Sequence, residues 1–268
     1  MNLLVTGGCG FIGSNFIYHV IKKNCIKKLI NFDCLSYAAD LDNVHKIEKN
    51  PKYALVKGDL KNFSHIFDAI YKNNISHVVH LAAETHVDNS IMAPDAFIES
   101  NIVGTFNLLK VARDLNLKRL HHVSTDEVYG ELKEKGKFKE TTPYDPRNPY
   151  AASKASADFL VRSYVNTYNL PATISNCSNN YGPRQHKEKF IPTIINSVLN
   201  GNKVPVYGKG LNIRDWIYVE DHCRALWKIL RKGKIGETYN VGADNEKKNI
   251  DIVKTVCRVL NISPKEHI

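Results

Sequence analysis

Short apolar runs alternate along the first two thirds of the chain with longer segments whose apolar residues recur at helical spacing. Six of the runs predict buried strands, at residues 3–6, 29–32, 53–57, 77–83, 120–123 and 172–176. The segments between them predict helices, at residues 14–23, 63–73, 101–115 and 150–168, with a more polar one at 40–50. Strands that alternate with helices over short connections predict an α/β fold, a doubly wound parallel sheet of the Rossmann type.

This regular alternation ends after residue 177. A polar loop follows, and then less regular elements, with helices at 191–200 and 220–231, an extended piece at 205–207, a strand at 238–241 and a last helix from residue 250. We therefore divide the chain into two parts. Residues 1–177 are predicted to bind a nucleotide and to carry the catalytic residues. Residues 178–268 are predicted to form a smaller, mainly substrate-binding lobe that is interleaved with the first part.

Glycines mark the junction between the first strand and the first helix. Gly7, Gly10 and Gly13 have a spacing close to the fingerprint of dinucleotide-binding sites, where glycine lets the backbone approach a pyrophosphate at the positive end of a helix. Asp33 ends the second strand, twenty residues after Gly13. Its carboxylate suits hydrogen bonds from a ribose diol and repels a 2′-phosphate. These residues therefore predict NAD, in preference to NADP, as the cofactor.

Two further strand ends are expected near this cofactor. Asp59 follows the third strand, where its carboxylate could bond the adenine amino group or cap the helix at residues 63–73. The small residues Ala82 and Ala83 end the fourth strand and would let the cofactor approach the backbone. His80 and His86 lie nearby without residues to complete a ligand set, so we predict no metal site and expect His80 to pack at the strand end.

The residues best suited to catalysis follow the fifth strand and open the long helix at 150–168. Thr125, Asp126 and Glu127 place a hydroxyl and two adjacent carboxyl groups at the edge where open α/β sheets bind ligands. Tyr150 and Lys154 are four residues apart and therefore share one helix face. An ammonium group beside a phenol favours the phenolate and lowers the tyrosine pKa. Tyr150 is therefore a candidate base for an alcohol that gives up a hydride.

Composition narrows the class of protein only slightly. The chain has 268 residues, of which 43% are hydrophobic and 24% charged, as in ordinary soluble globular proteins. Its net charge of +10 would suit a phosphate-bearing ligand or nucleic acid, but the lysines are scattered, which favours a solvated basic surface. Six cysteines without a Cys-x-x-Cys pair, no signal-peptide pattern and no membrane-spanning apolar run predict a cytoplasmic protein with reduced thiols.

Taken together, the motifs resemble a known family. Residues 6–13 and the Tyr150-x-x-x-Lys154 pair are similar to those of the extended short-chain dehydrogenase/reductases. More narrowly, the chain resembles the nucleotide-sugar 4,6-dehydratases over essentially its whole length, most clearly at residues 80–88, 124–130, 176–183 and 213–216. Thr125-Asp126-Glu127 is the most specific motif, because related sugar epimerases and decarboxylases lack the adjacent acids there.

This resemblance implies a lyase reaction on a nucleotide-activated glucose, dTDP-glucose or UDP-glucose, which gives a 4-keto-6-deoxy sugar for deoxysugar biosynthesis such as that of rhamnose. Tyr150, supported by Lys154 and Thr125, would remove the C4 hydroxyl proton while C4 gives hydride to NAD. Glu127 would take the C5 proton, and Asp126 would protonate the departing C6 hydroxyl. The hydride would then return to C6. One carboxyl group must therefore be protonated while its neighbour is ionised.

The resemblance also implies contacts residue by residue. Besides the fingerprint glycines, Asp33, Tyr150 and Lys154, it places near the cofactor Phe11, Ile12, Cys34, Leu35, Ser36, Asp59, Leu60, Leu81, Ala82, Ala83 and Asn180. It places near the nucleotide sugar Thr85, Thr125, Asn179, Lys189, Phe190, Pro205, Val206, Tyr207, Arg214 and Asn249. Arg214 would suit a diphosphate, because its guanidinium offers a planar fork of hydrogen-bond donors.

The sequence departs from the family pattern at Cys9, where alanine is common, and at residues 39–40, where Gly-Asn is usual. It ends at Ile268, whereas family members continue with a segment that helps to close the nucleotide site. The family usually forms homodimers through two helices, here residues 101–115 and 150–168. Two alternative functions stay open. One is a nucleotide-sugar 4-epimerase, against which the adjacent acids argue, and the other is a non-catalytic NAD-binding protein.

Overall fold

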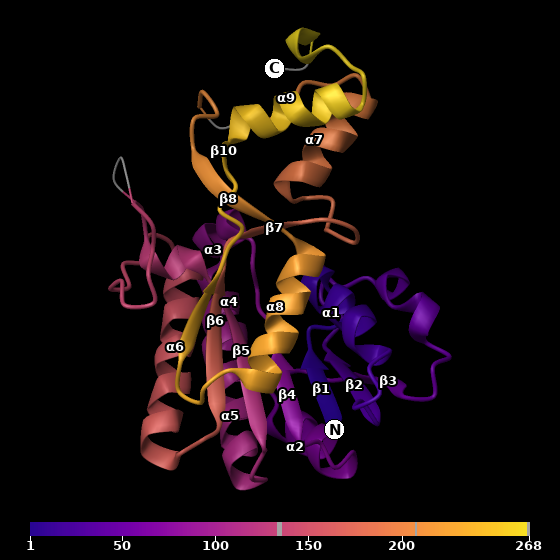
Figure 1. Cartoon of the computed structure of the whole chain (residues 1–268), viewed down its shortest axis with the longest axis vertical. Helices are drawn as coiled ribbons and strands as arrows, with labels where there is room; N and C mark the ends of the chain where they lie inside the picture. The colour runs from indigo at the N-terminus through magenta and orange to yellow at the C-terminus, as the bar shows by residue number, and fades with distance from the viewer. Residues whose placement is uncertain (133–135, 207, 267–268) are drawn as a thin grey trace.

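Consecutive residues of the central strands point to opposite faces of one parallel sheet. The computed structural model describes residues 1–132, 136–206 and 208–266. Its main sheet has the strand order β3-β2-β1-β4-β5-β6-β9 (Figure 1). These strands are β1 (Asn2–Thr6), β2 (Lys28–Asp33), β3 (Tyr53–Lys57), β4 (His77–His80), β5 (Arg119–Thr125), β6 (Ala172–Cys177) and β9 (Thr238–Val241). The doubly wound parallel sheet predicted from the sequence is confirmed.

The strand order creates the place where a ligand can bind. The chain runs outward from β1 to β3 and then restarts at β4, on the other side of β1. Connections therefore leave β1 and β4 in opposite directions, and a crevice opens at the carboxyl ends of these two strands. In parallel register, Thr6 of β1 lies opposite His80 of β4, so the glycine-rich turn and the loop after His80 meet at this crevice.

Helices cover both faces of the main sheet. On one face, α1 (Phe11–Ile21) and α8 (Val219–Lys232) pack against Leu3 and Val5 of β1. On the other, α2 (Phe63–Lys72), α5 (Gly104–Asp114) and α6 (Pro149–Tyr168) form a second core with Leu4. Both faces are thus buried, which explains why the strands appear in the sequence as continuous apolar runs rather than alternating patterns.

The long helix α6 begins and ends at strong local signals. The Asn148 side chain caps it by accepting a hydrogen bond from the backbone N–H of Ala151 at 2.8 Å, and Pro149 occupies the first turn. The helix ends at Asn169, whose φ of 54° is left-handed. The cap places Tyr150 and Lys154 in the first two turns, against the carboxyl end of β5.

A smaller unit lies beyond the carboxyl edge of the main sheet, at the top of Figure 1. It contains a three-stranded sheet of β10 (Glu246–Lys248), β8 (Ile213–Tyr218) and β7 (Asn179–Tyr181), together with α7 (Phe190–Leu199) and α9 (Asn249–Val259). The two helices pack through Ile194, Val198 and Val253. Between these elements the chain returns to the main sheet as α8 and β9. The division at residue 177 stays a prediction.

Several local expectations were wrong. The helix expected at residues 40–50 is two 3-10 turns, Leu41–Asn43 and His45–Ile47, because the Asp40 carboxylate accepts the backbone N–H of Asp42 and favours a tight turn. The helix expected at 101–115 starts earlier, as a π-helical segment at Ile98–Val103 that leads into α5. Two short helices, α3 (Val87–Met92) and α4 (Pro94–Phe97), were not expected. Within the described residues, no helix has both the length and the hydropathy that a bilayer crossing requires.

Candidate active site

A cavity of about 320 Å³ lies at the carboxyl ends of the central strands, where the crevice was expected. It is lined by segments that are far apart in the sequence, from the glycine-rich turn to the loop before α7. The residues assigned from the sequence that line it are Gly7, Gly10, Phe11, Ile12, Gly13, Asp33, Cys34, Ser36, Asp59, Leu60, Leu81, Ala82, Ala83, Thr85, Thr125, Asp126, Glu127, Tyr150, Lys154, Asn179, Asn180 and Lys189.

A few assigned residues lie outside this lining. They are Leu35, Phe190, Pro205, Val206, Arg214 and Asn249, and Tyr207 lies outside the described residues. The Leu35 side chain packs beside the core next to α1, and Phe190 stacks on Trp216 in the smaller unit. Arg214 is exposed on β8, yet its charge still acts on Asp126. The substrate contacts implied for these residues stay predictions.

The glycine-rich turn is shaped for a backbone approach. Gly7 has a φ of +70°, and a Cβ there would lie 2.8 Å from the Cα of Ala82. A Cβ on Gly13 would lie 2.1 Å from the carbonyl oxygen of Gly7. Gly10 is the N-cap of α1 and offers no side-chain cap, so the first turn of the helix faces the cavity with its positive end. These features fit the pyrophosphate of a dinucleotide.

Asp33, the last residue of β2, lies against the glycine-rich turn. Its two carboxylate oxygens accept the backbone N–H groups of Cys9 at 2.9 Å and Leu35 at 2.8 Å. Burial raises the pKa of Asp33, and these two hydrogen bonds oppose the rise. The carboxylate is thus held at the end of β2, in the position where a ribose diol would meet it.

The two roles considered for Asp59 can now be separated. The cap of α2 is Asn62, whose side-chain oxygen accepts the backbone N–H of Ser64 at 3.0 Å. Asp59 instead accepts the backbone N–H of Lys61 at 2.9 Å and lines the cavity. The capping alternative is therefore wrong, and a contact with the cofactor remains the prediction for Asp59.

The acid pair enters the cavity on a single turn. The hydroxyl of Thr125 accepts the backbone N–H of Glu127 at 3.3 Å and starts a 3-10 turn at Asp126–Tyr129. Burial raises the pKa of Asp126 to about 7, and the negative charge of the neighbouring Glu127 is the second largest cause. Glu127 in turn accepts a hydrogen bond from the Asn148 amide at 3.3 Å. The pair can therefore hold one proton near neutral pH, as the sequence-based mechanism requires.

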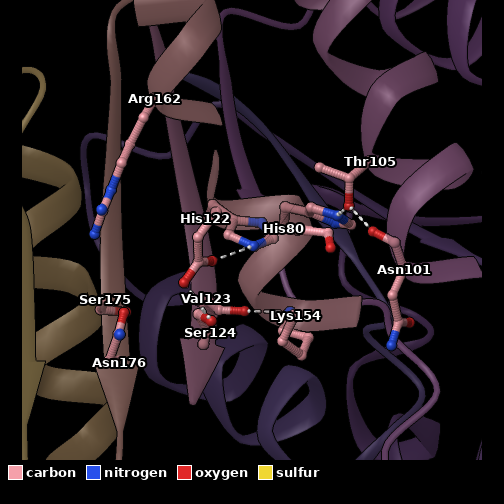
Figure 2. A network of polar contacts seen from close by, with 12 residues as sticks. His80, Asn101, Thr105, His122, Val123, Ser124, Lys154, Arg162, Ser175 and Asn176 are labelled. Atoms are coloured by element: carbon pink, nitrogen blue, oxygen red, sulfur yellow. Dashed lines mark hydrogen bonds and ion pairs between the residues drawn. The ribbon is translucent and has the colours of Figure 1, made fainter. Parts of the chain in front are cut away.

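Tyr150 differs from the sequence-based expectation. Burial, together with the nearby Glu127, raises its pKa well above the usual range, although a hydrogen bond with Thr125 opposes the rise. Lys154 was expected to lower this pKa, but its ammonium group donates to the backbone carbonyl of Val123 at 2.9 Å (Figure 2). In the protein alone, desolvation therefore affects the pKa of Tyr150 more than the charge of Lys154 does. The expected lowering of this pKa was wrong.

Some lining residues were not assigned from the sequence. Ser124, Cys177, Gln185, His186 and Glu188 all border the cavity. The last three lie beside Lys189, whose ammonium group donates to the carbonyl oxygen of Thr85 at 3.1 Å and so joins the loops after β4 and β7. Their nearness to Lys189 in the sequence was the one available signal. In the described part of the chain, no group of three or more His, Cys, Asp or Glu side chains could hold a metal ion.

A tyrosine–lysine pair at the carboxyl edge of a doubly wound sheet, beside a glycine-rich dinucleotide turn, defines the class of short-chain dehydrogenase/reductases. Comparison with family models narrows this class. Residues 4–266 match the family described as GDP-mannose 4,6 dehydratase, and the chain belongs to that family.

Individual relatives support the same placement. The chain is 49% identical over 269 residues to a dTDP-glucose 4,6-dehydratase of Neisseria gonorrhoeae, and the match covers 97% of this chain and 78% of the relative. It superposes on a dTDP-glucose 4,6-dehydratase of Streptomyces venezuelae, solved with NAD bound, with a TM-score of 0.96, 38% identity and coverage of 100% and 84%. A UDP-glucose 4-epimerase of Thermus thermophilus in complex with NAD has a TM-score of 0.90, 29% identity and coverage of 98% and 84%.

Proposed function

We propose that this protein catalyses the NAD-dependent 4,6-dehydration of a nucleotide-activated glucose, with dTDP-glucose as the expected substrate. The observation that carries the proposal is the acid pair Asp126 and Glu127, which shares one cavity with Tyr150 and Lys154. A hydride-transfer site needs only the tyrosine and the lysine. Removal of water across C5–C6 also needs one acid and one base, and the acid pair supplies both.

The first half of the proposed reaction belongs to Tyr150. Its phenolate oxygen takes the proton of the C4 hydroxyl, and Lys154 and Thr125 stabilise the negative charge that forms on the phenol. NAD, when bound, accepts the C4 hydride and later returns it at C6. Burial and Glu127 raise the pKa of Tyr150 in the protein alone, so the phenolate depends on the stabilisation by Lys154 and Thr125.

The second half belongs to the acid pair. The new C4 ketone acidifies the hydrogen at C5, and the Glu127 carboxylate removes it. Asp126 is protonated near neutral pH, because burial and Glu127 raise its pKa to about 7, and it donates that proton to the departing C6 oxygen. Water leaves, and the 4-keto-6-deoxy sugar results once C6 and C5 receive the hydride and a proton.

The residues that would hold NAD come from the ends of β1, β2 and β4, from α6 and from β7. We assign the pyrophosphate to the turn around Gly10 and the first turn of α1, and the adenosine ribose to Asp33. The nicotinamide end would lie between residues 81–83 and Tyr150. Lys154 and Asn180 line the same cavity and complete the proposed contacts.

The direct test is incubation of the purified protein with dTDP-glucose and UDP-glucose in separate reactions, with the products read by mass spectrometry. Loss of the mass of one water molecule is the expected outcome, and the relative rates would decide between the two nucleotides. Tyr150→Phe, which lacks one oxygen atom, is the matched control. An unchanged mass with a galactose-configured product would show an epimerase instead, and no reaction with either sugar would refute the proposal.

A homodimer is part of the proposal. The outward face of the Ile98–Val103 segment, α5 and α6 exposes large apolar side chains, namely Ile98, Val103, Phe106, Phe159 and Tyr168. A second copy of the chain would bury this face. Light scattering should give twice the monomer mass, and Phe106→Glu should give the monomer mass. A monomeric wild type would refute the dimer. We place the reaction in the cytoplasm, and the six free cysteines fit a reducing compartment.

A further inference from the structure

A closed cluster of polar side chains lies behind the proposed catalytic pair. Tyr150, Lys154 and Asp158 follow one another at four-residue steps on α6, so they share one face of the helix. Lys154 is 4% exposed, and Asp158 and His122 are fully buried. In Figure 2 a dashed line joins Lys154 to the carbonyl oxygen of Val123, the residue that follows His122 on β5. Asp158 and His122 have no role in the proposed mechanism.

The Asp158 carboxylate is firmly held. One oxygen accepts the hydroxyls of Ser124 and Tyr144, each at 2.9 Å. The other oxygen lies 3.2 Å from Nε2 of His122. The oxygen of Tyr144 also accepts a hydrogen bond from the Arg162 guanidinium at 2.9 Å. This contact brings a positive charge, in addition to that of Lys154, toward the carboxylate. Donors that converge on a buried carboxylate favour its charged form, so this arrangement suits an ionised Asp158.

The surrounding groups leave Asp158 as the counter-charge of Lys154. The titratable groups that face the cluster come from each element packed around it, namely Tyr150 and Arg162 on α6, His80 on β4, His122 on β5, Cys177 on β6 and Tyr144 in the loop before α6. Burial lowers the pKa of both His80 and His122 well below the usual value, so both rings are neutral. Burial raises the pKa of the Cys177 thiol to about 12, which leaves it uncharged as well.

Burial also lowers the pKa of Lys154, and Asp158 is the first group that opposes this effect. The pKa of Asp158 itself is raised to about 6, mainly by burial, which leaves the carboxylate ionised at neutral pH. A buried ammonium group next to neutral histidines would otherwise lose its proton at a lower pH.

We propose that Asp158 is a positioning residue that keeps Lys154 protonated within the core, so that the ammonium group is available to the phenol of Tyr150. His122, whose Nε2 lies 3.2 Å from one carboxylate oxygen, is a neutral neighbour of Asp158 and adds no second charge. The inference rests on the proposed function for its catalytic consequence. Lys154 and Asp158 make no direct ion pair, and the electrostatic pairing meant here acts between two buried groups on one helix face. It does not depend on the proposed function and can be tested separately.

The pairing is tested first by unfolding the protein without cofactor or substrate. Asp158→Asn keeps the side-chain shape but leaves the Lys154 charge uncompensated, so the denaturation midpoint at pH 8 should fall. Asp158→Asn combined with Lys154→Met removes both charges and should recover at least half of that fall. Losses that simply add in the double variant would overturn the pairing, whatever the activity of the protein.

The catalytic consequence is tested by the pH profile of kcat for dehydration. Lys154 must keep its proton, and removal of the Asp158 charge lowers its pKa, so the alkaline limb of Asp158→Asn should move to lower pH by about one unit or more. KM should change less than threefold.

The matched control is His121→Asn. This neighbouring histidine is equally buried but faces the opposite side of β5, where it bonds Thr173 at 3.0 Å. Its variant should leave the alkaline limb in place. If kcat falls in Asp158→Asn while the alkaline limb of its pH profile stays in place, Asp158 has a merely structural role and the inference is overturned. A wild type that dehydrates neither sugar would refute the proposed function, and the unfolding cycle would still decide the pairing.

Discussion

Replacement of Asp126 by asparagine should make this protein more stable and less active. In the folded chain, burial and the adjacent Glu127 raise the pKa of Asp126 from 3.8 to about 7. That difference corresponds to about 4 kcal/mol of unfavourable interaction for the charged form. Part of the side chain still contacts solvent, so we reduce the expected effect to about 2 kcal/mol. Asparagine carries no charge and avoids this cost.

The sign of the pH dependence follows from linkage. Folded Asp126 binds its proton more tightly than the unfolded chain does, so protonation contributes stability that is lost as pH rises from about 4 to about 7. The wild type carries the whole cost above pH 7. The variant should therefore be more stable by about 2 kcal/mol at pH 8 and by about half of that at pH 5.5.

Urea unfolding at the two pH values measures this effect. Asp68→Asn is the control, because Asp68 is exposed on α2 in a surface pair with Lys72, and its variant should differ from the wild type by less than about 0.5 kcal/mol at either pH. If Asp126→Asn is no more stable than the wild type at pH 8, or is more stable by the same amount at both pH values, the buried charge of Asp126 does not destabilise the fold. The same variant lacks the proton donor and should dehydrate substrate about 100-fold more slowly.

Three other substitutions, with Gly10→Ala as the control for one of them, test the rest of the site. Tyr150→Phe should abolish C4 oxidation and with it all turnover, and substantial residual dehydration would contradict its role as the base. Glu127→Gln should allow C4 oxidation but block elimination, so absorbance at about 340 nm from bound NADH should rise when substrate is added, and a flat signal would place Glu127 in an earlier step. Gly13→Ala should abolish NAD binding in calorimetry, because its Cβ would lie 2.1 Å from the Gly7 carbonyl oxygen. Gly10→Ala, at 3.3 Å from the same atom, should bind NAD better than Gly13→Ala does.

Elements that depend on nearby residues were well predicted from the sequence. The third strand and the strand at Thr238–Val241 have the predicted bounds, and α6 begins where Asn148 and Pro149 signal a helix start. Strands β7 and β10 were missed because each has three residues and lacks an apolar run. Their stability comes from pairing with β8, and that partner is distant in the sequence.

The chemistry of the site shows the same limit. The Tyr–Lys spacing, the adjacent acids and the glycine turn are local patterns, and the sequence was enough to bring them to one predicted edge of the sheet. The raised pKa of Tyr150 and the close approach of Asp158 to His122 could not be predicted, because they depend on how α6 lies against β5. One turn of a helix does not indicate which strand residues it will bury.

The sequence by itself determined which groups this protein can use, namely a dinucleotide turn, two acids, a tyrosine and a lysine. Periodicity and side-chain chemistry are properties of neighbours in the chain, and they persist in any context that preserves the element. The tertiary structure decided which of these groups hold a proton. Desolvation depends on every segment that packs around a side chain, so the states of Asp126, Tyr150 and Lys154 exist only once β5, α6 and the loops above them have come together.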